Sequence, residues 1–239
     1  MHQAPGAILA DSLRPGAQLL HPTHIFFLLM VSKGKEAPDG VTAKCEDCVK
    51  GTIPRKHLAI PQHPATPVLE RIHSNVCGPT EVMSLGRKRY FVLFTDEYTR
   101  YITGYFMQQK SEVFDYFEEY CPSVERLTRE KVKALCTDGG GKYQGNQFQE
   151  YLRKHGIKSE CTAPYTPQEN GIAESLNRTL LNKVLSMMSA AGAPKSFWVL
   201  ACQTAIYLRN RSPSKSIDEQ TPYDKWFGRI PDIGHLLVW

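Results

Sequence analysis

Residues 132–139 read VKALCTDG, and this stretch decides the fold class. Val132, Ala134 and Cys136 alternate along it, which is typical of a β-strand with one face in the core. The glycines that follow Asp138 end the strand. Side chains at the carboxyl end of a central strand project into the crevice where α/β proteins bind their ligands, so Asp138 is a candidate functional residue.

Strand and helix patterns continue from this stretch in both directions. Ser111 begins a helix in which Phe114, Phe117 and Tyr120 recur at helical spacing. The short connection that contains Asp96 is expected to be a hairpin turn, with a structural role for Asp96. This succession of strands and helices along the chain predicts one mixed α/β layer structure. The other expected strands are 68–77, 89–95, 101–107 and 157–162, and the other expected helices are 146–155, 170–191 and 197–211.

The composition narrows the class of protein. Of the 239 residues, 41% are hydrophobic, which is enough to build a core and excludes wholesale disorder. The longest apolar run, IFFLLMV at 25–31, is far shorter than the ~20 residues of a membrane span, so no membrane partner is expected. Seven mostly isolated cysteines indicate a reducing, intracellular compartment. The net charge of +5 is compatible with a polyanionic partner.

A second carboxylate, Glu174, lies in the first turn of the helix expected at 170–191. It points away from the apolar stripe of that helix, on a polar face that also carries Asn177 and Arg178. Asp138 and Glu174, if brought together, would repel each other unless a divalent cation neutralised them. On the residues alone a purely structural reading stays open, in which Asp138 caps a turn and Glu174 stabilises a helix N-terminus.

Several runs, in order, resemble the integrase region of copia-type retrotransposon polyproteins: IHSNVCGP at 72–79, RYFVLFTDEYTRY at 89–101, TDGGGKY at 137–143, APYTPQENGIAES at 163–175 and TPYDKWFGRIPDIGHL at 221–236. The resemblance implies a ribonuclease-H-like fold with a five-stranded mixed sheet flanked by helices. It also implies a site of two Asp and one Glu that binds Mg²⁺ or Mn²⁺, with 35 residues between the last two members. Asp138 and Glu174 match those two, since the residues between them, 139–173, number 35.

Asn75 occupies the position of the first aspartate of that family. Two-metal phosphoryl transfer needs the negative charge of the carboxylate there, and an asparagine offers only a neutral carbonyl oxygen. We therefore expect DNA strand cutting and joining to be impaired in this chain. The alternative is a non-catalytic, element-derived domain that binds nucleic acid or a protein partner. Nearby departures from the family pattern are Lys142 for an acidic residue, Glu169 for a glutamine and Ser175 for a basic residue.

The resemblance also implies a zinc module and a DNA-binding surface. Cys45 and Cys48 have the spacing of two thiolate ligands, and His21 matches one histidine of a His-His-Cys-Cys module. The other histidine has no counterpart, so Zn²⁺ with one ligand missing and a metal-free cysteine pair both stay open. The residues that the resemblance places against DNA are Tyr165, Gln168, Asn177, Arg178 and Lys183.

The expected organisation divides the chain into five parts: a weakly ordered tail at 1–20, the zinc-binding-like module at 21–60, a proline-rich linker at 61–67, the integrase catalytic core at 68–212 and a C-terminal extension at 213–239. The resemblance implies a further DNA-binding region beyond this extension. It also implies homo-oligomers on the DNA of element ends and target, and a nuclear location after a cytoplasmic particle stage.

Overall fold

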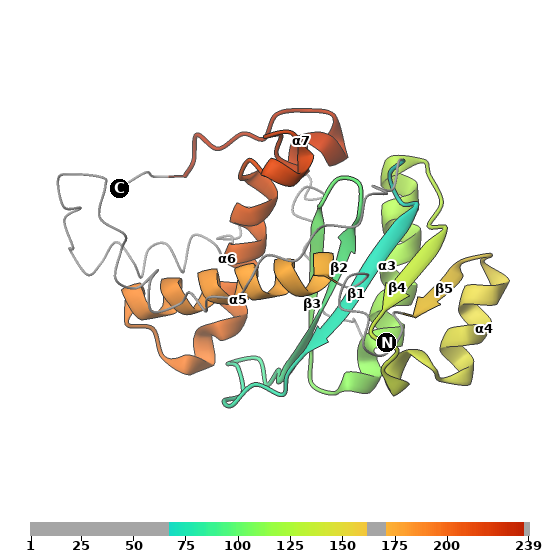
Figure 1. The fold of residues 1–239 in the computed structure, drawn as a ribbon. Helices are drawn as coiled ribbons and strands as arrows, with labels where there is room; N and C mark the ends of the chain where they lie inside the picture. The colour runs from blue at the N-terminus through green and yellow to red at the C-terminus, as the bar shows by residue number, and fades with distance from the viewer. Residues whose placement is uncertain (1–66, 162–170, 237–239) are drawn as a thin grey trace, which may run out of the picture.

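A computed structural model of the chain describes residues 67–161 and 171–236, apart from the side chains of 171–175. Five strands form one sheet in the order β3-β2-β1-β4-β5 (Figure 1). β1 (Arg71–Cys77) pairs antiparallel with β2 (Tyr90–Asp96), which pairs antiparallel with β3 (Ile102–Met107). On its other side β1 pairs parallel with β4 (Ala134–Thr137), which is followed by parallel β5 (Lys158–Cys161). The expected mixed five-stranded sheet is confirmed.

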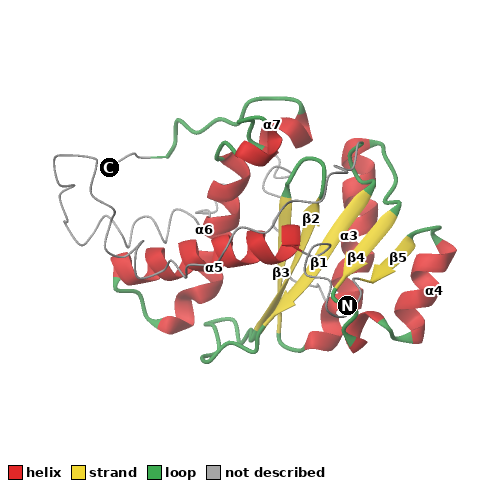
Figure 2. Ribbon diagram, viewed as in Figure 1, coloured by secondary structure: helices red, strands yellow, loops and turns green. Residues whose placement is uncertain are grey.

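Helices cover both faces of the sheet (Figure 2). On one face lie α3 (Val113–Thr128) and α4 (Asn146–Lys154), and on the other lie α5 (Gly171–Ala191) and α6 (Trp198–Arg211). None of the helices in the described ranges is long and apolar enough to cross a bilayer.

The inner strand β2, between β3 and β1, supplies apolar side chains to both layers. Val92 and Phe94 pack in the core under α3, whereas Phe91 and Leu93 pack in the core under α5 and α6. Phe94 stacks on Tyr120 with ring centroids 4.7 Å apart. Because side chains alternate across a strand, a continuous apolar run is what a strand buried on both faces requires.

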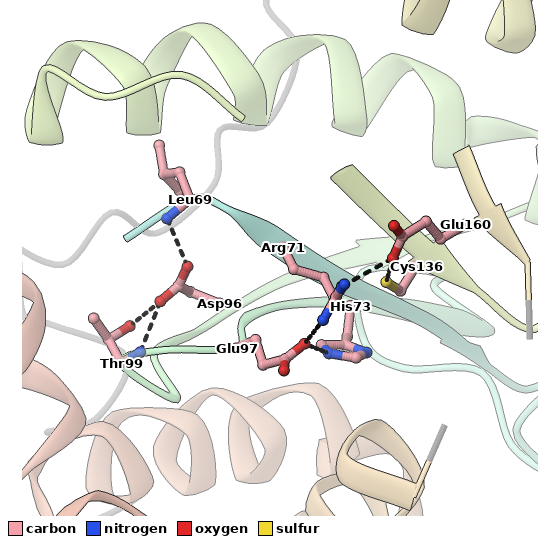
Figure 3. A network of polar contacts seen from close by, with 8 residues as sticks. All are labelled: Leu69, Arg71, His73, Asp96, Glu97, Thr99, Cys136 and Glu160. Atoms are coloured by element: carbon pink, nitrogen blue, oxygen red, sulfur yellow. Dashed lines mark hydrogen bonds and ion pairs between the residues drawn. The ribbon is translucent and has the colours of Figure 1, made fainter. Parts of the chain in front are cut away.

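The first strand starts later than the pattern predicts. β1 begins at Arg71, because Leu69 adopts a left-handed backbone with φ 63° and cannot continue the ladder. The Leu69 N–H donates instead to Oδ1 of Asp96, at 2.9 Å (Figure 3). Asp96 Oδ2 accepts from the N–H and the hydroxyl of Thr99, both at 2.7 Å. The expected structural role of Asp96 at the β2–β3 turn is therefore confirmed.

A helix that sequence analysis missed, α7 (Pro222–Phe227), lies within the C-terminal extension. Thr221 Oγ1 accepts from the Asp224 N–H at 3.0 Å, and Gly228 ends the helix with φ 66°. Trp226 stacks on Tyr101 with ring centroids 5.0 Å apart, so α7 extends the core under α3. The sequence does contain signals for this helix: a threonine cap, a proline at the first helical position and a glycine after the last.

Candidate functional site

The parallel register of β1 and β4 brings Asn75 level with Asp138. Ile72 pairs with Leu135 and His73 pairs with Cys136. The same register, continued two residues beyond this paired segment, sets Asn75 opposite Asp138. Asn75 on β1 and Asp138 just after β4 thus lie towards the same end of two neighbouring strands. The Ser74 side chain forms a hydrogen bond with Tyr143, on the face of the sheet that α4 covers. Because side chains alternate along a strand, Asn75 points to the opposite face, where α5 contacts β1.

Asp138 lies directly after β4 with its carboxylate in two contacts. Oδ1 accepts from the Gly140 N–H at 3.0 Å, and Oδ2 forms an ion pair with Nζ of Lys142 at 3.1 Å. The Asp138 side chain is 39% exposed, while that of Lys142 is only 15% exposed. Lys142, noted in the sequence only as a departure from the family, is therefore the residue whose charged side chain is paired with the candidate carboxylate.

The turn that carries Lys142 is anchored to β1. Tyr143 is buried, and its hydroxyl lies 2.5 Å from Oγ of Ser74, the neighbour of Asn75. Burial raises the pKa of Tyr143, so the phenol stays protonated and available for this hydrogen bond. Gln149 of α4 donates to the Tyr143 carbonyl at 2.7 Å. These contacts hold Lys142 over Asp138.

Cys77, at the end of β1, lies within electrostatic reach of both charged groups. Burial raises the pKa of its thiol to about 11, Lys142 opposes that rise, and Asp138 adds to it. The thiol is therefore neutral at physiological pH and carries no charge in the site.

The remaining predicted site residues divide into those outside the described structure and those on α5. Glu174 lies in the first turn of α5, but its side chain is outside the described residues. Also outside are Tyr165, Gln168, and the zinc candidates His21, Cys45 and Cys48.

The polar face expected on α5 needs a correction. Asn177 is buried, with 6% of its surface exposed, and its Nδ2 has no hydrogen-bond partner in the described part of the chain. Leu180 and Val184 are buried along the same helix. Positions 177, 180 and 184 follow the i, i+3, i+7 pattern of one buried sector, because α5 packs against both β1 and α6. Arg178, next to Asn177, is half-buried.

Lys183 belongs to a group of basic side chains rather than to an open helix face. It is half-buried, and burial together with Arg209 of α6 lowers its pKa. The pKa of Arg209 is lowered in turn by burial and by Arg100 in the β2–β3 turn. No carboxylate in the described ranges forms an ion pair with Lys183 or Arg209. Glu97 and Asp96 lie near Arg100 and offset its charge, so Lys183 and Arg209 carry the positive charge that suits an anionic partner.

A buried polar network behind the site was not predicted (Figure 3). Glu97 Oε2 lies 2.8 Å from Nε2 of buried His73 and 3.4 Å from Arg71. Arg71 Nε also donates to Glu160 of β5 at 2.9 Å. Burial alone would raise the pKa of Glu160, but hydrogen bonds from Lys158, Cys136 and Arg71 lower it to about 2. The network connects β1, β4 and β5. In the sequence, the alternation of Arg71 and His73 along β1 is the feature that could have indicated it.

Comparisons with known proteins agree with this fold. Residues 70–167 match the family model of the integrase core domain. The chain carries an integrase core domain. The Pol polyprotein of transposon TNT 1-94 from Nicotiana tabacum is 42% identical over 200 residues, covering 83% of this chain and 15% of the polyprotein. That of transposon RE2 from Arabidopsis thaliana is 32% identical over 201 residues, covering 84% of this chain and 14% of the polyprotein.

This integrase core therefore spans only a small part, about 15%, of the curated relatives that it matches. They are plant transposon polyproteins, which is consistent with the resemblance to copia-type elements. Among solved structures, one chain of the simian T-cell lymphotropic virus intasome in complex with PP2A regulatory subunit B56 gamma has a TM-score of 0.53. That chain is 16% identical, and the match covers 76% of this chain and 62% of the other, so it supports the fold alone.

The described side chains of this integrase core do not fit a pair of divalent cations. Within the described ranges no three His, Cys, Asp or Glu residues lie close enough to hold a metal ion. At the expected position Asn75 is neutral, and the charge of Asp138 is already paired with Lys142. A carboxylate site for Mg²⁺ needs negative charge in excess, and these side chains supply none.

Proposed function

We propose that this chain is the integrase domain of a retrotransposon, a polynucleotidyl transferase by ancestry that binds DNA and whose strand transfer is impaired. The register that sets Asn75 beside Asp138 carries this proposal. Insertion of element DNA by two-metal phosphoryl transfer depends on carboxylates that converge on two cations. Replacing one carboxylate by an amide removes a full negative charge at ligand distance, where electrostatic energies reach several kcal/mol even at an effective dielectric constant of ~20.

DNA binding rests on basic side chains on and near α5. Arg209 lies close enough to Lys183 to lower the pKa of Lys183, and Arg178 is half-buried on the same helix as Lys183. Phosphate contacts by such groups give salt-dependent binding with little sequence preference. In this proposal Tyr165 and Gln168 contribute from the segment before α5, and Asn177 supports that surface from within the fold.

A strand-transfer assay tests the proposal with the full chain, Asn75→Asp and Asn75→Ala. With Mg²⁺ or Mn²⁺ we expect little or no product from the wild type and from Asn75→Ala, and a measurable gain for Asn75→Asp. All three proteins should bind DNA with similar affinity. Robust turnover by the wild type would refute the impairment.

The second candidate is a non-catalytic domain that binds nucleic acid or a protein partner, and Asn75 is the observation that favours it. A mobility-shift titration across a salt series, run beside the strand-transfer assay, separates the two candidates. DNA binding without turnover in either the wild type or Asn75→Asp supports the non-catalytic domain. Turnover that rises in Asn75→Asp supports the impaired integrase.

Three further expectations belong to the same proposal. We propose a zinc module built on His21, Cys45 and Cys48, which metal analysis of the purified chain tests: a zinc content well below one per chain would contradict it. We propose homo-oligomers on DNA, which sedimentation with and without a DNA end measures. We propose a nuclear location, which microscopy of the tagged protein checks.

A further inference from the structure

Lys142 lies where its ammonium group contacts the candidate site without being open to solvent. Nζ is 3.1 Å from Asp138 Oδ2 and 5.0 Å from the centre of the Tyr143 ring. It is also 3.2 Å from the position that a Cβ on Gly140 would occupy, so a side chain at 140 would crowd the ammonium. The lysine is 15% exposed, which distinguishes it from a solvated surface lysine.

The ammonium is held by the fold rather than by its own ion pair. Tyr143 fixes the 3-10 turn Gly141–Tyr143 through its buried ring and its hydrogen bond to Ser74. The Lys142 backbone therefore cannot swing away from Asp138 without breaking the contact with β1. An ion pair whose partners are already held in place costs little conformational entropy when it forms.

Among the described side chains at this position, the charges balance without any added ion. Asn75 contributes none, and Asp138 and Lys142 cancel. A divalent cation placed at Asp138 would meet a fixed positive charge within a few ångströms. It would also gain no second carboxylate from β1.

We propose that Lys142 is the resident cation of this site: its ammonium takes the place of a divalent cation at Asp138 and excludes one. The inference rests on the proposed function only in that Asn75 and Asp138 mark the ancestral site. Its consequence is that restoring the missing carboxylate alone gives only weak metal binding. Tight binding requires that both the charge lost at Asn75 and the charge added at Lys142 be reversed.

Mn²⁺ binding to the full chain, without DNA, tests this directly by electron paramagnetic resonance of free Mn²⁺ and by calorimetry. The series is wild type, Asn75→Asp, Lys142→Gln and the double variant, each after subtraction of Mn²⁺ binding by Asp138→Asn. We expect no specific binding by the wild type and weak binding by each single variant. The double variant should bind Mn²⁺ at least about tenfold more tightly than Asn75→Asp, because one positive charge near a divalent ion costs that much even in water.

The matched control is Lys131→Gln, which removes a lysine from another ion pair, that with Glu125. Lys131 precedes β4, whereas Asp138 follows the opposite end of that strand. Combined with Asn75→Asp, Lys131→Gln should leave Mn²⁺ affinity unchanged. Thermal unfolding checks that each variant folds, and Lys142→Met, which keeps the length of the side chain without the charge, replaces Lys142→Gln if that variant does not.

Two results would overturn the proposal. One is equal Mn²⁺ affinity of Asn75→Asp and the double variant, and the other is tight, Asp138-dependent Mn²⁺ binding by the wild type. Failure of the proposed function is visible separately, since the absence of DNA binding in every variant would refute that function without changing the order of Mn²⁺ affinities.

Discussion

Asn210 at the end of α6 pairs its side-chain amide with the backbone of Ile102 at the start of β3. Oδ1 accepts from the Ile102 N–H at 3.0 Å, and Nδ2 donates to the Ile102 carbonyl at 2.8 Å. β3 is an edge strand of the sheet, so these backbone groups face no neighbouring strand. The amide thus forms the two hydrogen bonds that a neighbouring strand would otherwise form, and these bonds connect α6 to the sheet.

Asn210→Ala should lower the free energy of unfolding by about 2–3 kcal/mol, because it leaves a buried N–H and a buried carbonyl without partners. Urea unfolding followed by circular dichroism measures the change. Asn146→Ala, at an exposed position of α4, is the control and should change stability by less than about 0.5 kcal/mol. A cost for Asn210→Ala as small as that of the control would show that water replaces the amide.

Trp226→Ala should cost about 3 kcal/mol or more, since it removes a large buried ring that stacks on Tyr101. Trp226→Phe should recover most of this loss because it keeps an aromatic ring in the stack. Chemical denaturation of the three proteins provides the comparison. If Trp226→Ala unfolds at the wild-type midpoint, α7 contributes nothing to the stability of the core.

Gly139→Ala should disturb the segment that carries Asp138. Gly139 has φ 68°, and an added Cβ would lie 2.3 Å from Sγ of Cys161. The left-handed backbone alone costs about 1–2 kcal/mol for alanine, and the clash adds to it. Combining Gly139→Ala with Cys161→Ala should remove the clash and leave only the cost of the left-handed backbone.

Gly141→Ala is the matched control in the same loop, because a Cβ there meets no atom within 4 Å. It should be neutral or slightly stabilising. Equal melting temperatures for Gly139→Ala and Gly141→Ala would contradict the predicted strain.

Glu160 makes stability depend on pH in acid. Its pKa falls from 4.5 to about 2 in the folded chain, so its contribution is fully present above pH 4.5 and is lost as the pH falls towards 2. Glu160→Gln should lower stability by about 1–3 kcal/mol at pH 7, the range for hydrogen bonds to a charged group. The difference between the two proteins should shrink below pH 4.5 and vanish near pH 2 in thermal melts. A difference that is constant with pH would show that the charge of Glu160 is not responsible.

Local patterns predicted most of the elements, and each exception has a physical cause. The alternation along β4 and the apolar spacing of α3 depend on near neighbours, so their positions were predicted to within a few residues. The expected cap at Ser111 was wrong, because Ser111 lies inside a 3-10 turn and Glu112 precedes α3. The late start of β1 depends on Asp96, 27 residues away from Leu69. α7 is too short for periodicity to reveal, and only its caps mark it.

The candidate site divides in the same way. The sequence alone indicated the motifs around Asn75, Asp138 and Glu174 and the family to which they belong, because these depend on residue type and spacing. The pairing of Lys142 with Asp138, the burial of Asn177 and the grouping of Lys183 with Arg209 were decided by tertiary structure. Each of these depends on which strand or helix lies beside a side chain, and that is set by packing across the sheet rather than by neighbours in the chain.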